Sequence, residues 1–179
     1  VISTNRAGVL EAMTYLTGLG HRRIGFIGGR ADLVSSYRRL LGYRSGLERA
    51  GIPFNPDYVV DGDYTAETGY RSALKLLTQP DHVTAVVAAN DESAFGVIDA
   101  ARELGLDIPG DLSIIGFDNV PAARLIDPPL TTVDQSLETM GYTAAAMLLD
   151  MIAGRPLEES VRKIETKLVL RDSCAPPAL

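Results

Sequence analysis

Short apolar segments alternate with amphipathic segments along most of this chain, and this alternation limits the possible folds more than any other feature. Four segments rich in Val, Ile and Gly are predicted to be buried strands: 22–29, 58–64, 83–90 and 112–118. Apolar residues at helical spacing predict helices at 7–19, 37–50, 66–77 and from 91 or 93 to 104. Strands of this kind separated by helices favour a parallel sheet covered on both faces, which is a doubly wound α/β fold.

A double proline precedes the last part of the chain. Pro128 and Pro129 begin the segment PPLTTVDQ, after which a helix over 136–152 and a last strand over 162–170 are predicted. Proline restricts its own backbone and that of the residue before it, so this connection should be stiff and extended. A stiff segment that leaves one body for another is what a hinge between two lobes requires.

Composition excludes several classes of protein. The net charge of −6 is unfavourable for binding DNA through phosphate contacts. No apolar run approaches the roughly 20 residues that span a bilayer, and the first residues do not resemble a signal peptide. A single cysteine is compatible with a reducing cytoplasm. There is no metal-binding spacing, phosphate-binding loop or nucleophile motif, so we expect no metal, no cofactor and no enzymatic activity.

Three of the predicted strands end in polar side chains. They are Asp63-Tyr64, Asn90-Asp91 and Asp118-Asn119, and a fourth loop over 30–39 adds hydroxyl and guanidinium groups. In an open parallel sheet, ligands bind beyond the carboxyl ends of the strands. Carboxylates, an amide, an arginine and an aromatic ring together suit a polyol, because they accept and donate hydrogen bonds to hydroxyls and pack on a ring face.

Each of these residues taken alone has a simpler explanation. Asp91 could be a helix N-cap, and Tyr64 could be ordinary edge packing. Arg39 could be a solvated residue of the first helical turn, and the adjacent Arg38 competes with it for the role of ligand contact. His21 has no motif partner and is expected to be structural. The grouping at equivalent strand ends is stronger evidence than any one member.

The motifs along the chain resemble one known family. The segments are GHRRIGFIGG, GDYTAETGY, VTAVVAANDESAFGV, GLDIPGDLSIIGFDN and PPLTTVDQ. In this order they resemble the effector-binding domain of the lactose- and galactose-repressor (LacI/GalR) family, over about residues 3–177. The resemblance implies a fold like that of periplasmic sugar-binding proteins, with an effector in the cleft between two lobes and a homodimer formed through both.

The resemblance also implies the residues of the site. Those carried over by motif, together with Asp91, form the expected effector-binding set: Ser35, Arg39, Tyr64, Asn90, Asp91, Asp118 and Gln135. Leu33 and Tyr37 stand where some members have further polar contacts, so the identity of the effector stays open.

We expect one complete lobe and part of a second. Residues 1–19 and 135–154 are assigned to an incomplete N-terminal lobe, and residues 20–134 and 155–179 to the C-terminal lobe. The family's helix-turn-helix is absent from the sequence, so operator DNA would be bound only through a missing N-terminal domain. The expected function is the sensing and dimerisation domain of a cytoplasmic bacterial repressor, which binds a sugar or similar metabolite. The alternative is a periplasmic sugar-binding protein of a transport system.

Overall fold

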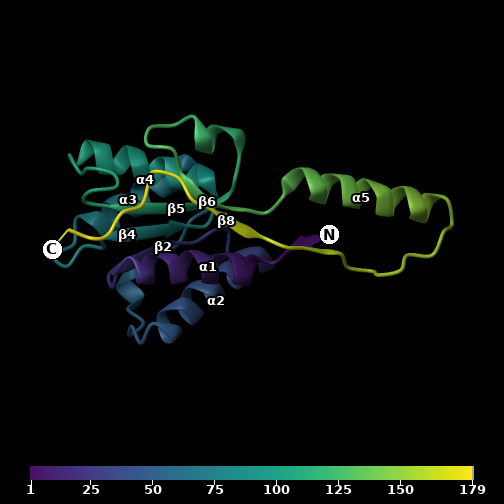
Figure 1. Cartoon of the computed structure of the whole chain (residues 1–179), viewed down its shortest axis with the longest axis horizontal. Coiled ribbons are helices and arrows are strands. Elements are labelled where there is room, and N and C mark those ends of the chain that lie inside the picture. The colour runs from purple at the N-terminus through teal and green to yellow at the C-terminus, as the bar shows by residue number, and fades with distance from the viewer. Residues whose placement is uncertain (179) are drawn as a thin grey trace.

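A six-stranded sheet forms the centre of the molecule, with its strands in the order β3-β2-β4-β5-β6-β8 (Figure 1). The computed structural model describes residues 1–178. The sheet consists of β2 (Ile24–Ile27), β3 (Val59–Val60), β4 (Ala85–Ala88), β5 (Ser113–Asp118), β6 (Thr131–Asp134) and β8 (Lys167–Val169). The strands from β3 to β6 pair in parallel, whereas β8 is antiparallel to β6. The predicted doubly wound α/β fold is confirmed, with one antiparallel strand at an edge.

Helices cover both faces of this sheet (Figure 1). One face carries α1 (Asn5–Gly18) and α2 (Val34–Arg49), and the other carries α3 (Ala66–Leu77) and α4 (Asp91–Glu103). Two short 3-10 helices are η1 (Pro56–Tyr58) and η2 (Pro121–Arg124). Neighbouring strand residues point to opposite faces, so Phe26 joins the core under α1 and α2 whereas Ile27 joins the core under α3 and α4. Burial on both faces explains why these strands are continuous apolar runs in the sequence.

Three predicted boundaries differ from the structure. The strand predicted over 58–64 is only two residues long, Val59–Val60, where it pairs with β2. The helix predicted from residue 37 begins at Val34, which places Ser35 in its first turn. The strand predicted over 162–170 is two strands, β7 (Lys163–Ile164) and β8. β7 joins the two-stranded sheet and β8 joins the six-stranded sheet. The apolar pattern of one segment does not show that its two halves pair with strands of different sheets.

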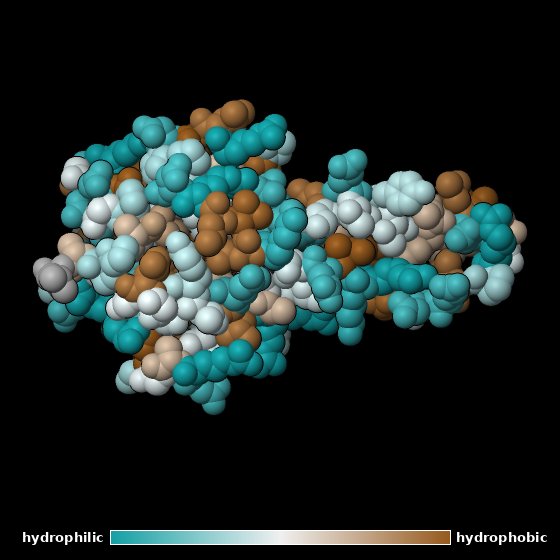
Figure 2. All heavy atoms as spheres, viewed as in Figure 1, coloured by the Kyte–Doolittle hydropathy of each residue, from teal (hydrophilic) through white to brown (hydrophobic). Residues whose placement is uncertain are grey.

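A helical arm extends from one end of the sheet (Figure 1). It consists mainly of α5 (Leu137–Ile152), and β1 (Ile2–Ser3) pairs in parallel with β7 at its base. No residue of α5, all of which is described, is fully buried. Hydrophobic side chains lie exposed along the arm (Figure 2), among them Tyr142, Leu149 and Ile152. No helix in the described part of the chain is long and apolar enough to cross a membrane.

The structure moves two boundaries of the predicted lobes. Residues 1–19 were assigned to the incomplete lobe, but α1 is part of the main core, because Val9, Met13 and Leu16 pack there with Phe26. Residues 155–179 were assigned to the complete lobe, but β7 pairs with β1 at the base of the arm. Amphipathicity shows that a helix has a buried face without showing which body covers it. Three segments therefore connect the main body and the arm: 3–5, 134–136 and 164–167.

His21 has the structural role that was expected for it. Its side chain is fully buried, with Nδ1 2.9 Å from the Thr84 hydroxyl and Nε2 2.9 Å from the Ala175 carbonyl oxygen. These bonds tie the turn before β2 to the residue before β4 and to the C-terminal segment.

Candidate functional site

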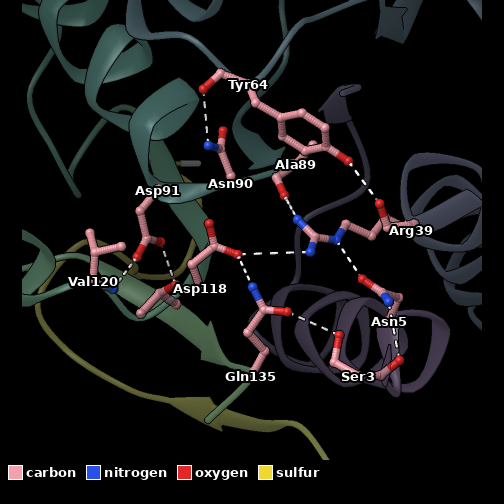
Figure 3. Close-up of polar contacts among 12 residues, drawn as sticks. Ser3, Asn5, Arg39, Tyr64, Ala89, Asn90, Asp91, Asp118, Val120 and Gln135 are labelled. Carbon is pink, nitrogen blue, oxygen red and sulfur yellow. Dashed lines mark hydrogen bonds and ion pairs between the residues drawn. The ribbon is translucent and has the colours of Figure 1, made fainter. Parts of the chain in front are cut away.

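The carboxyl ends of β2, β4 and β5 lie where the chain reverses its direction across the sheet. From β2 the chain crosses to β3 on one side, and it then returns to β4 on the other side of β2. Such a switch point leaves a crevice beyond the strand ends, and ligands of doubly wound proteins bind there. The structure brings Arg39, Tyr64, Asn90 and Asp118 together around this point (Figure 3).

Arg39 lies at the centre of this cluster, and its guanidinium group is held from several sides. The residue is 5% exposed. Its Nε donates to Asn5 Oδ1 at 2.8 Å, and its Nη1 donates to the carbonyl oxygen of Ala89. The guanidinium carbon lies 3.7 Å from the centroid of the Phe117 ring, in a cation–π arrangement. Burial lowers the pKa of Arg39, and the charge of Asp118 opposes that effect. The group is therefore a fixed, oriented donor.

Asp118 is the last residue of β5 and faces Arg39. Its Oδ1 lies 3.8 Å from Arg39 Nη2 and accepts a hydrogen bond of 2.6 Å from Gln135 Nε2. Burial raises the pKa of Asp118 to about 7, although Arg39 and Gln135 both act to lower it. Oδ2 accepts no hydrogen bond from any described residue, and 20% of the side chain is exposed. This oxygen can accept hydrogen bonds from the hydroxyl groups of a ligand.

Tyr64 supplies an aromatic ring beside Arg39. Its hydroxyl lies 2.6 Å from the Ser36 hydroxyl and 3.4 Å from that of Ser35, so Ser36 is its closer partner. The ring lies directly against Gly29, where an added Cβ would be 2.1 Å from Tyr64 Cζ. Gly29 is therefore required for this position of the ring, for steric reasons.

Asn90 follows β4 and caps α4. Its Oδ1 accepts a hydrogen bond of 3.0 Å from the Ser93 backbone N–H, and its Nδ2 donates to the Tyr64 carbonyl oxygen at 3.0 Å. Asn90, rather than Asp91, is thus the N-cap. The amide joins the loops that follow β3 and β4.

Asp91 lies below the surface of the site. It is 0% exposed, and its carboxylate accepts hydrogen bonds from the Val120 backbone N–H at 2.8 Å and from the Thr132 hydroxyl. Burial raises the pKa of Asp91 to about 6. The structure therefore places Asp91 where it ties the loop after β5 to β6, without a surface that a ligand could touch.

Strained backbone is concentrated around this cluster. Four non-glycine residues of the described chain have positive φ: Tyr64, Asp118, Asn119 and Ser136. The first three lie at or beyond the carboxyl ends of β3 and β5, and Ser136 is next to Gln135. Left-handed backbone is unfavourable for such residues, and it persists where the surrounding structure requires it, often at functional sites. The coincidence is a second, independent reason to place the candidate site at this end of the sheet.

Sequence reasoning missed several members of the cluster. Ser3 and Asn5 enter from the first connecting segment, Ser36 contacts Tyr64, Phe117 lies under Arg39, and Thr132 contacts Asp91. The alternation of side chains along β5 could have indicated Phe117, because it precedes Asp118. Nothing local marks Asn5, since its partner lies 34 residues away.

The cluster is only partly exposed: Arg39 is buried, whereas Tyr64 and Asp118 are half-buried. A hollow of about 180 Å³ lies beside it and is lined partly by Gly29, Ser36 and Tyr37. Larger hollows are found along α1, where Ala7 and Leu10 line them, and one of these is also lined by Ser3 and Asn5 of the cluster. We place the site at the polar cluster, because there the hydrogen-bonding groups and the strand ends coincide.

Comparison with known proteins agrees with this geometry. Residues 13–174 match the family model of the periplasmic binding protein-like domain. Together the parallel sheet, the switch-point cluster and this match define an α/β domain of the periplasmic binding protein-like class.

Its relatives identify the branch of that class. The chain is 38% identical over 169 residues to the HTH-type transcriptional repressor CytR of Escherichia coli K12, covering 94% of this chain and 50% of CytR. It is 43% identical over 175 residues to the repressor PurR of Yersinia pestis, covering 98% of this chain and 51% of PurR. The structure of a LacI family regulator from Enterococcus faecium with bound ribose matches with a TM-score of 0.86 and 31% identity, covering 98% of this chain and 65% of that one. The chain belongs to the LacI family, and it spans about half the length of these curated relatives.

Proposed function

We propose that this chain is the effector-sensing part of a LacI-family transcriptional repressor, and that the effector is a sugar or a related hydroxyl-bearing metabolite. The observation that carries the proposal is the pairing of Arg39 with Asp118 at the switch point, with one carboxylate oxygen left without a donor among the described residues. The ribose-bound regulator from Enterococcus faecium supports this class of ligand.

Each group of the site has a role in such binding. Asp118 accepts hydrogen bonds from ligand hydroxyls, and Arg39 donates through Nη2, whose direction is set by the bonds at Nε and Nη1. Tyr64 packs against the face of a sugar ring, and Ser35 and Gln135 add polar contacts at the margin. Asn90 and Asp91 hold the loops that carry these groups.

The bound effector then acts through the connecting segments. A ligand shifts the balance between two arrangements of the lobes only if it binds one of them more tightly. In the complete protein this shift would change the spacing of two DNA-reading domains in a homodimer, which binds its operator in the cytoplasm. The same groups bind rather than transform the ligand, so the proposed role is not enzymatic. The relatives described above are regulators, which favours this function over a transport protein.

The proposal is tested by ligand binding to the full-length protein. A thermal-shift screen of sugars, nucleosides and polyols should reveal a stabilising ligand, because a binder stabilises according to its concentration relative to its Kd. Calorimetry should then show that Asp118→Ala and Arg39→Ala each weaken binding at least about tenfold, the size expected when a charged group loses a hydrogen bond.

A matched control is an exposed ion pair outside the site, Asp99 with Arg102. Asp99→Ala and Arg102→Ala should bind the ligand as the wild type does. Unchanged affinity in Asp118→Ala would refute the assignment of the site. An export signal encoded upstream of Val1, in place of a helix-turn-helix, would refute the repressor.

A further inference from the structure

Five residues at the base of the site form a closed ring of polar contacts (Figure 3). Ser3 Oγ donates to Gln135 Oε1 at 3.0 Å, and Gln135 Nε2 donates to Asp118 Oδ1 at 2.6 Å. Asp118 pairs with Arg39, and Arg39 Nε donates to Asn5 Oδ1 at 2.8 Å. Asn5 Nδ2 closes the ring by donating to the Ser3 carbonyl oxygen at 3.1 Å.

The ring joins the site to two of the three segments that connect the main body and the arm. Ser3 and Asn5 lie on the first segment and Gln135 on the second, whereas Arg39 and Asp118 belong to the sheet body. Ser3, Asn5 and Arg39 are each no more than 5% exposed, so water competes little for their hydrogen bonds. The site therefore has a direct polar connection to the place where a hinge would move.

The side chain of Asn5 serves the site rather than its own helix. Asn5 is the first residue of α1, and the N-cap position before it is Thr4, which makes no side-chain capping bond. Both polar atoms of the Asn5 amide are used within the ring. If Asn5 acted only on local helix geometry, its oxygen would be directed to a backbone N–H of α1.

The geometry of Arg39 shows what Asn5 contributes. Nε is bound by Asn5 and Nη1 by the Ala89 carbonyl, and these two acceptors fix the plane of the guanidinium over Phe117. Nη2, the atom nearest Asp118, is then directed by the other two. Removing the Asn5 amide releases one edge of the group and lets it rotate away from the orientation that faces the site.

We propose that Asn5 is a positioning residue for this site, and that the ring of Ser3, Asn5, Arg39, Asp118 and Gln135 couples the effector contacts to the first two connecting segments. The functional part rests on the proposed function, in which Arg39 and Asp118 contact the effector. If Ser3 moves relative to Gln135, the hydrogen bonds that orient Arg39 and Asp118 change. Coupling between two sites is reciprocal, so a ligand that reorients Arg39 and Asp118 shifts the arrangement of the connecting segments by the same coupling free energy.

The first test follows the Arg39 Nε–H directly by nitrogen-15 NMR, without any effector. In the wild type this proton should be protected from exchange with water, because it is buried and bonded to Asn5. Asn5→Ala should remove the protection, whereas Asn5→Asp keeps an acceptor oxygen and should retain it. The matched control is Asn55→Ala, which removes a half-buried asparagine that caps η1, far from the ring in the sequence. Protection that survives in Asn5→Ala would overturn the positioning role.

The second test measures coupling around the ring by a double-mutant cycle of unfolding. Asn5 and Gln135 share no hydrogen bond with each other, so non-additivity between Asn5→Ala and Gln135→Ala must pass through the other members. We expect the combined effect on the unfolding equilibrium to depart from additivity by about threefold or more, as for residues of one network. Additive effects would overturn the coupling.

The final test is effector affinity, which should fall about tenfold in Asn5→Ala and stay unchanged in Asn55→Ala. If no effector binds the wild type while the NMR and unfolding results hold, the proposed function fails and the ring stands. If the effector binds the wild type and Asn5→Ala equally well, the positioning role fails and the proposed function stands.

Discussion

Replacing Asp118 by asparagine should make the protein more stable at neutral and alkaline pH. Burial raises the pKa of Asp118 from an ordinary value of 3.8 to about 7, so the folded protein prefers the neutral carboxyl group. One pKa unit corresponds to about 1.4 kcal/mol, so the ionised carboxylate lowers the free energy of unfolding by about 4 kcal/mol above pH 7. The asparagine side chain has the shape of the protonated acid and carries no charge. A cost of this size at one residue is typical of a position kept for function rather than stability.

The size of the effect changes with pH in a defined way. A carboxyl group whose pKa is raised by folding stabilises the fold fully below its unfolded pKa, and this contribution is lost as the pH rises through the folded value. For Asp118 the window runs from about 3.8 to about 7. Urea unfolding of the wild type and Asp118→Asn should therefore give a difference of about 4 kcal/mol at pH 8, falling to about 2 kcal/mol at pH 5.

Asp63→Asn is a matched control with the opposite sign. Hydrogen bonds from Thr65 lower the pKa of Asp63, so its ionised form is favoured in the folded protein. Its contribution is present above the unfolded pKa, and Asp63→Asn should be slightly less stable than the wild type at pH 8. If Asp118→Asn gains no stability at pH 8, or gains the same amount at pH 5 and pH 8, the buried-carboxylate reasoning is wrong.

Two further substitutions test the supports of the site. Gly29→Ala should displace the Tyr64 ring, because the new Cβ would lie 2.1 Å from Tyr64 Cζ. Calorimetry should then show weaker effector binding. The control variant Gly18→Ala, which has no atom within 4 Å of its added Cβ, should bind the effector normally. An unchanged affinity in Gly29→Ala would show that Tyr64 does not contact the ligand. Thr132→Val should lower the free energy of unfolding by about 1–3 kcal/mol, because the buried Asp91 carboxylate loses a hydrogen-bond donor. Thr132→Ser keeps the hydroxyl, so denaturation curves that show equal losses in both variants would contradict this reasoning.

The sequence alone determined the class of fold and most of the polar cluster. Strands such as Ile24–Ile27 and Ala85–Ala88 are buried on both faces, so they leave continuous apolar runs that periodicity detects. The carboxyl ends of parallel strands share one edge, so the polar residues after them must converge, as Asn90 and Asp118 do. These inferences need only local patterns and one rule of topology.

Only the tertiary structure decided which polar groups face the site and which support it from below. Asp91 and Asp118 both lie at the carboxyl ends of apolar strands, yet Asp91 is fully buried under the loop that contains Val120, and Asp118 keeps an exposed edge. Asn5 and Arg39 are 34 residues apart and meet because α1 and α2 pack on the same face of the sheet. The physical reason is that hydrogen bonds and burial depend on distances in the folded chain, which residue spacing along a sequence does not specify.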